Sequence, residues 1–211
     1  MQIYKKYLSI IIPIYNEEGN ILKLYNKIIS SLEASRLSNY EIIFINDGST
    51  DDSATLLYQI SKKDFNAKII NLVTNQGQTA AISAGIEYSQ GEIIIPMDGD
   101  LQNDPKDIPN LIDKLNEGFD VVSGWRKHRK DKTISRILPS KIANWIVSKI
   151  SGVYLHDYGC SLKAYRSDII KNIKLYGEMH RFIPVFSYWQ GGKIEEIVVA
   201  HHPRKHGKTS Y

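Results

Sequence analysis

Short apolar segments alternate along the first 125 residues with longer segments in which apolar residues recur every three or four positions. The short segments are rich in β-branched residues and predict strands at residues 8–15, 41–46, 68–73, 92–97 and 120–123. The longer segments predict helices at residues 20–37, 54–60, 79–89 and 105–116. Because the strand segments are apolar almost throughout, both faces of each strand should be covered. The pattern therefore predicts an α/β fold, with a mostly parallel, Rossmann-like sheet covered by helices.

No linker, internal repeat or low-complexity segment divides the chain, so we expect residues 1–211 to form a single domain. The N-terminal residues become charged too early for a secretory signal, and no apolar run approaches the ~20 residues that a membrane-spanning helix needs. We therefore expect no part of this chain to cross a bilayer.

The chain contains one cysteine, Cys160. A single cysteine excludes an internal disulfide framework and a cysteine-rich zinc site, and it favours a reducing, cytosolic environment. We expect Cys160 to be a small buried thiol.

Charge is unevenly divided along the chain. Residues 1–125 hold 10 Lys and Arg against 17 Asp and Glu, a net charge of −7, whereas residues 126–211 hold 17 against 6, a net charge of +11. An acidic half suits a metal ion, and a basic half suits phosphate, nucleic acid or a membrane surface. Because RNA-binding motifs with interleaved aromatic residues are absent, we expect no nucleic-acid partner.

Polar residues follow each of the first four predicted strands. They are Tyr15-Asn16-Glu17, Asn46-Asp47-Gly48-Ser49, Asn75-Gln76-Gly77 and Asp98-Gly99-Asp100. Because ligands bind beyond the carboxyl ends of the strands in an open α/β sheet, we expect these clusters to converge on one crevice.

The two carboxylates after the fourth strand predict a metal site. Asp98 and Asp100 are two residues apart, so they can point to a common position, and the sequence has no Lys or Arg closer than Lys106 to neutralise them. Carboxylates left in that arrangement repel each other, and Mg²⁺ or Mn²⁺, which prefer oxygen ligands, would relieve the repulsion. Gly99 would leave room for a phosphate.

Two common classes of nucleotide-binding protein lose support from the sequence. The chain has neither the G-x-G-x-x-G motif of dinucleotide-binding oxidoreductases nor the G-x-x-x-x-G-K-[ST] motif of P-loop nucleotidases. A metal and individual side chains would have to hold the phosphates instead.

Seven segments together resemble one family in their order and spacing. They are PIYNEEGNI (13–21), INDGSTDDS (45–53), NQGQTAAISAGI (75–86), MDGDLQNDP (97–105), DYGCSLKAYR (157–166), GEMHRFIP (177–184) and RKHGKTSY (204–211). The chain resembles the family 2 glycosyltransferases of the polyprenyl-phosphate type, such as dolichol-phosphate mannosyltransferases and undecaprenyl-phosphate glucosyltransferases. The resemblance implies a GT-A fold in which residues 1–125 form the nucleotide-sugar and metal half and residues 126–211 form a basic half facing the acceptor and the membrane.

The resemblance also implies roles for individual residues. The implied nucleotide-binding residues are Pro13, Tyr15, Glu17, Asp47 and Asp98, and the implied metal-binding residues are Asp98, Asp100 and Gln102. The implied catalytic residues are Asp157, Arg126 and Arg136, and the implied residues for the acceptor or its phosphate are Arg166, His180, Arg181, Arg204 and Lys208. The two catalytic arginines would offset phosphate charge, and Asp157 would either orient the acceptor or act as a base.

The sequence departs from the family pattern at two places. The segment that usually reads D-x-x-S-G-F-R carries Leu162 and Lys163 in place of Gly-Phe, which leaves the local backbone and the acceptor contact open. Asn46 stands where the family commonly has the first Asp of D-D-G-S, and an amide can donate as well as accept hydrogen bonds.

The implied reaction is inverting transfer of a sugar from a UDP- or GDP-linked donor to undecaprenyl or dolichyl phosphate, at the cytoplasmic face of the membrane. Residues 133–150 are amphipathic, basic and contain a tryptophan, so this segment could lie in a membrane interface or form a core helix. The chain would be either a peripheral enzyme or the soluble part of a longer membrane protein, and a homo-oligomer stays open. Two alternatives remain: transfer to a soluble or polymeric saccharide, and an inert module that binds anionic lipids.

Overall fold

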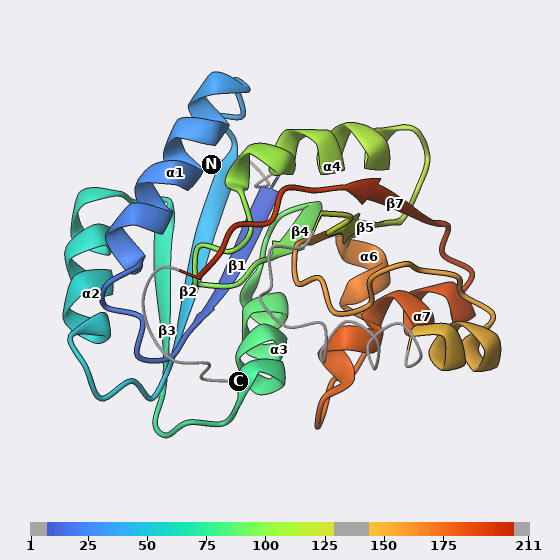
Figure 1. The fold of residues 1–211 in the computed structure, drawn as a ribbon. Helices are drawn as coiled ribbons and strands as arrows, with labels where there is room; N and C mark the ends of the chain where they lie inside the picture. Colours follow the sequence, from blue (N-terminus) through green and yellow to red (C-terminus); the bar gives the residue numbers. More distant parts are fainter. Residues whose placement is uncertain (1–7, 129–143, 205–211) are drawn as a thin grey trace, which may run out of the picture.

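The computed structural model describes residues 8–128 and 144–204. Among these residues, the central feature is a seven-stranded sheet with the order β3-β2-β1-β4-β6-β5-β7 (Figure 1). The strands are β1 (Leu8–Ile14), β2 (Tyr40–Asp47), β3 (Ala67–Leu72), β4 (Ile93–Pro96), β5 (Val121–Trp125), β6 (Lys163–Arg166) and β7 (Ile194–Val198). The helices are α1 (Ile21–Ala34), α2 (Ser53–Lys63), α3 (Gln78–Tyr88), α4 (Ile108–Asn116), α6 (Ser167–Ile170) and α7 (Ile183–Trp189). Two 3-10 helices are η1 (Pro105–Asp107) and η2 (Met179–Phe182), and residues 144–151 are also helical.

Within the described residues the sheet is mostly parallel, as predicted. Neighbouring strands pair in parallel except β6, which runs antiparallel to both β4 and β5. The strands and helices predicted in residues 8–125 are present, with ends shifted by a few residues. The sequence analysis did not predict β6 or β7, which bring residues from the basic half into the sheet.

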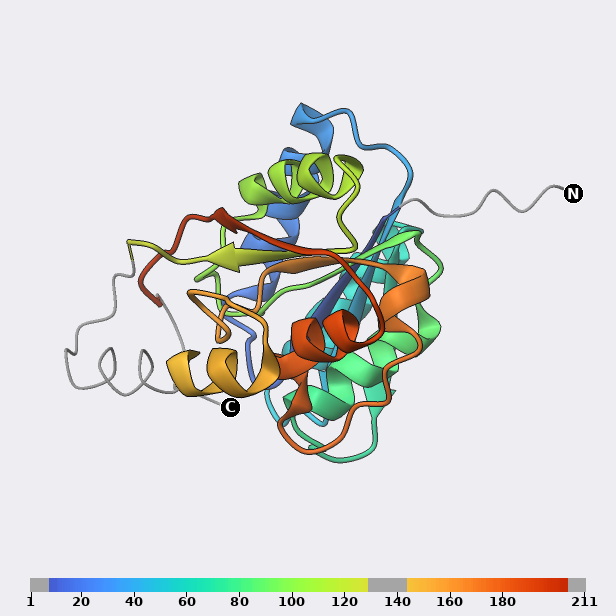
Figure 2. The same cartoon turned by 90° about the vertical axis from the view of Figure 1, so that its right-hand side faces the viewer.

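Helices cover both faces of the sheet, as its apolar strands require. Apolar residues of α1, α2 and α4 join one core cluster, and those of α3, α6 and α7 join another on the opposite face. Along β1, Ile10 and Ile12 belong to the first cluster and Ile11 to the second, because successive side chains point to opposite faces. Figure 2 shows the sheet between the two helical layers.

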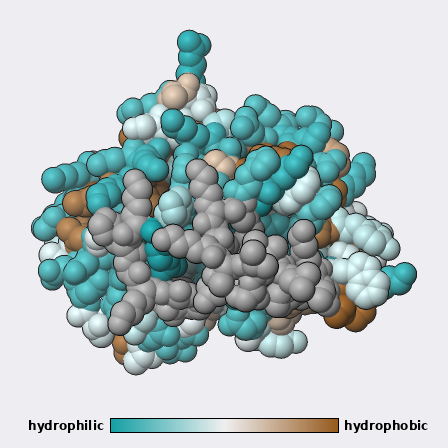
Figure 3. Space-filling model, in the orientation of Figure 1, coloured by the Kyte–Doolittle hydropathy of each residue, from teal (hydrophilic) through white to brown (hydrophobic). Residues whose placement is uncertain are grey.

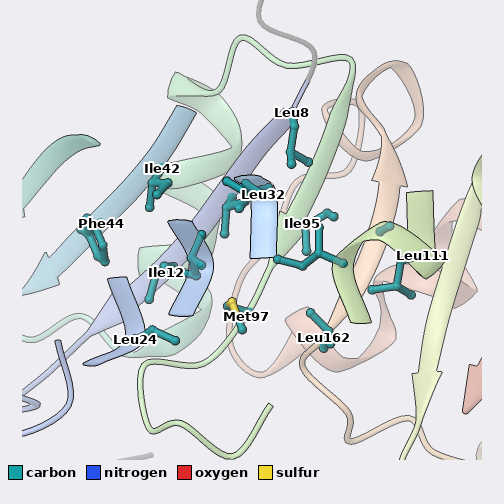
Figure 4. Close-up of a cluster of buried hydrophobic side chains, with 14 of the residues drawn as sticks. Leu8, Ile12, Leu24, Leu32, Ile42, Phe44, Ile95, Met97, Leu111 and Leu162 are labelled. Atoms are coloured by element: carbon teal, nitrogen blue, oxygen red, sulfur yellow. The ribbon is translucent and has the colours of Figure 1, made fainter. Parts of the chain in front are cut away.

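The larger core cluster links the two halves of the chain. Ile12, Phe44 and Met97 from the first half share it with Leu162, which directly precedes β6 (Figure 4). Cys160 is fully buried in the same cluster, as expected, and burial raises the pKa of its thiol to about 11. This core fixes the loop before β6 against the strands that carry the polar clusters.

The sheet opens between β1 and β4 at their C-terminal ends. The paired residues run from Leu8 and Ile93 to Ile11 and Pro96, and the Met97 N–H donates to the Ile11 carbonyl at 2.9 Å. Backbone groups along a strand bond alternately to its two neighbours, so Pro13, two residues after Ile11, also faces β4. Proline has no N–H to donate, so the pairing cannot continue through it. The strand order also reverses here, with β2 and β4 on opposite sides of β1. Open α/β sheets bind ligands at such a point.

Candidate active site

A cleft with a volume of about 390 Å³ lies at this opening, within the size range of small-molecule sites. It is lined by ten of the residues that the sequence assigned to the site: Pro13, Tyr15, Glu17, Asp98, Asp100, Gln102, Arg126, His180, Arg181 and Arg204. They come from the ends of β1, β4 and β5, from η2, and from the segment after β7. The fold therefore brings residues of both halves to one cleft.

Other predicted site residues lie elsewhere. Asp47 and Asp157 are buried and are not part of the cleft lining. Arg166 pairs with Ile93, the first residue of β4, and its guanidinium donates to the carbonyl of Leu115 at 3.1 Å. Because β6 is antiparallel to β4, its last residue lies at the end of the sheet opposite to the cleft, which corrects the placement of Arg166 at the acceptor. Arg136 and Lys208 lie outside the described residues.

The loop after β4 holds Asp98 and Asp100 in a constrained conformation. Asp98 Oδ1 accepts a hydrogen bond from Gln78 Nε2 at 2.7 Å, and Asp100 Oδ1 accepts one from the Gln102 N–H at 3.0 Å. Leu101 adopts a left-handed backbone with φ of 64°, which is costly for a residue other than glycine. Gly99 has a packing reason, because a Cβ there would lie 2.7 Å from Ile14 Cδ1.

Asp100 forms an ion pair with an arginine in this structure. Arg204 Nη2 lies 2.7 Å from Asp100 Oδ2, although no cation is near Asp100 in the sequence. The segment that carries Arg204 is held against the loop by a bridge between His201 and Asn103 and by a hydrogen bond from the His202 N–H to the Gln102 carbonyl. No Lys or Arg is closer than Lys106 in the sequence, but the fold brings Arg204 to Asp100 and so supplies the cation that the sequence neighbourhood lacks.

The acidic loop fits a divalent metal that is shared with a ligand. Burial, and next the charge of Asp100, raise the pKa of Asp98, so a cation placed between the two carboxylates would be favoured. The amide oxygen of Gln102 could add a third ligand. The described residues contain no group of three His, Cys, Asp or Glu side chains arranged to hold a metal alone. Mg²⁺ in particular is usually held by one or two carboxylates, substrate phosphates and water, which fits this incomplete set.

Asp47 organises the loop beside the acidic residues. Its carboxylate accepts hydrogen bonds from the N–H groups of Gln76 at 2.7 Å and Gly77 at 3.0 Å. Gly77 is the N-cap residue of α3, and the next residue, Gln78, bonds Asp98. Asp47 therefore supports Asp98 through the start of α3 without lining the cleft.

Replacing Asp47 with alanine should destabilise the protein by about 2–4 kcal/mol, because the N–H groups of Gln76 and Gly77 both lose hydrogen bonds to a buried, charged acceptor. It should also weaken nucleoside-diphosphate binding more than acceptor use, since Gln78 loses its support. Thermal denaturation and calorimetry with UDP and GDP measure both effects. Asp52→Ala, at an exposed position in the same turn whose side chain makes no cap hydrogen bond, is the control. A change confined to the acceptor KM would contradict this prediction.

Arg126 and Asp157 form a buried, bidentate ion pair. Arg126 Nε lies 2.7 Å from Asp157 Oδ2, and Arg126 Nη2 lies 2.9 Å from Asp157 Oδ1. Their side chains are 13% and 7% exposed. Burial alone would lower the pKa of Arg126, but the bonds to Asp157 outweigh that effect and raise it, so the guanidinium stays charged. Asp157 thus holds a permanent cation at the cleft.

His180 lines the cleft and is held neutral there. Its Nδ1 lies 2.6 Å from the hydroxyl oxygen of Thr79 on α3. Burial, and next the charge of Arg181, lower the pKa of His180 to about 4, so the ring is uncharged at neutral pH. Its other nitrogen, Nε2, can therefore bond a ligand without adding charge.

The sequence analysis missed five polar residues that line the cleft: Gln78, Tyr158, Ser161, Lys163 and Tyr165. Lys163 and Tyr165 reach it because β6 is a central strand, which the sequence did not predict. The sequence did hold one signal that Lys163 could belong to the site, because this residue departs from the family pattern in a segment that otherwise matches it.

The fold is of the GT-A type. The structure is similar to the crystal structure of glucosyl-3-phosphoglycerate synthase from Mycobacterium tuberculosis, in complex with Mn²⁺, UDP-glucose and phosphoglyceric acid. The TM-score is 0.71 with 18% sequence identity, over 95% of this chain and 73% of that one. The family model described as Glycosyl transferase family 2 matches residues 9–181 of this chain. This chain belongs to glycosyl transferase family 2.

Two relatives cover 97% of this chain. One is a dodecaprenyl-phosphate galacturonate synthase from Rhizobium johnstonii, at 46% identity, and the other is an undecaprenyl-phosphate 4-deoxy-4-formamido-L-arabinose transferase from Shewanella sediminis, at 37%. The chain spans 61% and 62% of the lengths of these two relatives. Within the described residues, no helix combines the length and apolar character needed to span a bilayer.

Proposed function

We propose that this chain transfers a sugar from a nucleoside-diphosphate sugar to a polyprenyl phosphate, with inversion at the anomeric carbon. The observation that carries the proposal is that carboxylates and arginines line one cleft. Asp98 and Asp100 could hold a metal there, and Arg126 and Arg181 suit phosphate. A metal-bound diphosphate and a second phosphate could therefore be held side by side.

The chemistry requires positioning more than proton transfer. A phosphate monoester has a second pKa near 6, so its oxygen is largely ionised at neutral pH and can attack without a strong base. The new bond joins that oxygen to the anomeric carbon, and the bond from this carbon to the donor diphosphate breaks, which releases the nucleoside diphosphate. A bound metal would stabilise the charge on the leaving diphosphate, and Arg126 would offset the charge of two phosphorylated reactants.

The names of the relatives support the identification of the acceptor more strongly than that of the transferred sugar. Both printed names specify a polyprenyl phosphate, but one specifies galacturonate and the other a formamido-arabinose. The mycobacterial structure contains Mn²⁺ and UDP-glucose, which supports a divalent metal and makes uridine the first base to test. Mg²⁺ and GDP-linked donors are the matched alternatives.

The deciding assay combines UDP- or GDP-linked sugars with a short polyprenyl phosphate in detergent, with Mg²⁺, Mn²⁺ or neither. We expect release of nucleoside diphosphate and a lipid-linked sugar of inverted configuration only when metal and lipid phosphate are both present. Transfer to a water-soluble saccharide and none to the lipid, or retained configuration, would contradict the proposal. Lipid binding without transfer from any donor would indicate an inert module.

An exposed aromatic surface supports action at the membrane, which we propose is its cytoplasmic face. Helix 144–151 exposes Trp145, Ile146 and Ile150, with exposed fractions of 65%, 43% and 80%. Trp189 of α7 lies beside this helix, because its indole N–H donates to the Ser151 carbonyl at 3.2 Å. In Figure 3 pale aromatic and brown aliphatic side chains meet in this region, at the lower right. Clustered aromatic and aliphatic residues suit the interface of a bilayer.

Replacing both Trp145 and Trp189 with glutamate should reduce sedimentation with anionic liposomes at least tenfold, because apolar contact is lost and negative charge is added. The variant should still bind UDP with unchanged affinity, since neither residue lines the cleft. Phe65→Glu is the matched control: Phe65 is 97% exposed and lies between α2 and β3, far from helix 144–151 (Figure 1). Equal liposome binding by all three proteins would exclude this surface as the docking site.

A further inference from the structure

Strand β6 directs two polar side chains to the inner wall of the cleft. Lys163 and Tyr165 are two residues apart, so they share the face of β6 that is covered by α3 and α7. Both line the cleft, yet they are only 3% and 1% exposed. The proposed reaction involves a metal, the donor diphosphate and the acceptor phosphate. None of these three groups has been assigned to Lys163 or Tyr165.

The Lys163 ammonium is paired with carbonyls and not with a carboxylate. Nζ donates to the carbonyl oxygens of Tyr158, at 3.1 Å, and Cys160, which uses two of its three N–H donors. The carboxylates that influence it are engaged elsewhere, since Asp157 holds Arg126 and Asp98 belongs to the acidic loop. Burial lowers the pKa of Lys163, so a ligand that supplies a negative charge would stabilise the ammonium form and accept its remaining N–H.

Tyr165 places a second donor on the same wall. Its hydroxyl makes no hydrogen bond to the part of the chain that the structure describes, although the side chain is almost fully buried. Burial raises the pKa of Tyr165 well above its usual value, so the hydroxyl keeps its proton and can donate. A hydroxyl on the cleft wall without a partner among the described residues is available to donate to a ligand oxygen.

The position and number of donors favour a carboxylate over a phosphate. The cations that suit phosphate are arginines: Arg126 and Arg204 line the same cleft with side chains that are 13% and 25% exposed, and Arg181 is exposed. Lys163 and Tyr165 instead lie at the buried inner wall between α3 and α7, where a phosphate bearing a long lipid chain would have to enter past the donor. One N–H and one O–H match the two oxygens of a carboxylate, whereas a phosphate monoester presents three.

We infer that Lys163 and Tyr165 recognise a carboxylate on the transferred sugar, so that the donor is a nucleoside-diphosphate uronic acid. This inference rests on the proposed function, because it takes the cleft to be the donor-sugar site. His180 lines the same cleft, and its Nε2 is available to bond a sugar hydroxyl. The uncharged analogue of such a sugar carries a hydroxymethyl group, which would leave the ammonium without an anion.

The test compares donors that differ only in this group. Calorimetry with Mn²⁺ measures binding of UDP-galacturonate against UDP-galactose, or of GDP-mannuronate against GDP-mannose if the protein binds GDP and not UDP. We expect the uronate to bind at least 100-fold more tightly, since a site built for a polar group rejects an analogue that lacks it. Equal or weaker binding of the uronate would overturn the inference, and this readout needs no acceptor, so it stands apart from failure of the transferase proposal.

Two variants assign the preference to these residues. Lys163→Met keeps a chain of similar length without the charge and should abolish the preference for the uronate, while the affinity for UDP or GDP alone stays unchanged. Tyr165→Phe should reduce the preference about tenfold. A Lys163→Met protein that keeps the preference would contradict the assignment, and so would one that loses only affinity for polyprenyl phosphate, because Lys163 would then bind the acceptor. The donor comparison on the unaltered protein remains decisive if a variant does not fold.

Discussion

Replacing Asp98 with asparagine should reduce sugar transfer at least 1000-fold while leaving the fold intact. The amide keeps the size of the side chain and can still accept the hydrogen bond from Gln78, but it brings no charge to the metal. Because burial and Asp100 raise the pKa of Asp98, the ionised carboxylate disfavours the folded state at neutral pH. The metal-free variant should therefore melt at the same temperature as the unaltered protein or slightly higher.

The second readout of this change is independent of activity. Mn²⁺ with UDP should raise the melting temperature of the unaltered protein, since a ligand that binds only the folded state stabilises it. The same addition should have little effect on Asp98→Asn. Asp113→Asn, at an exposed position on α4, is the matched control and should respond like the unaltered protein. Equal metal-dependent stabilisation of Asp98→Asn and the control would mean that Asp98 does not hold the metal.

The parallel part of the fold could be predicted because its strands carry their own signal. All seven residues of β1 are buried, and an apolar run of this kind is informative without knowledge of its partners. β6 carries no such signal, since its four residues include Lys163 and Arg166 and it is a strand only through its pairing with β4 and β5. Tertiary context decided this element, and with it the unpredicted inner wall of the cleft.

The candidate site could be predicted where it depends on the ends of parallel strands. Asp98, Asp100 and Tyr15 follow such strands and line one cleft. The placement of Arg166 failed because it depends on the direction of β6. The ion pair between Asp100 and Arg204 joins residues 104 positions apart, and no local pattern encodes such a contact. Residues that follow predicted strands were therefore placed better than residues that reach the cleft by long-range packing.

Replacing Asp157 with asparagine should lower the free energy of unfolding by about 3–5 kcal/mol, because Arg126 would be left as a buried cation without its carboxylate. For a protein of this size the melting temperature should fall by roughly 10 °C. Sugar transfer should also fall, since Arg126 would no longer be held at the cleft. Thermal denaturation and steady-state kinetics measure the two effects. Asp168→Asn, at an exposed position on α6, is the control.

The pH profile of transfer separates the two roles that the sequence left open for Asp157. Both of its carboxylate oxygens accept hydrogen bonds from Arg126, and the residue does not line the cleft. A base must reach the proton that it removes, whereas a positioning residue needs only to hold its partner. We therefore expect Asp157→Asn to raise KM and lower kcat without changing the shape of the pH–rate profile. Loss of the acidic limb of that profile, with donor and acceptor KM unchanged, would instead identify Asp157 as the base.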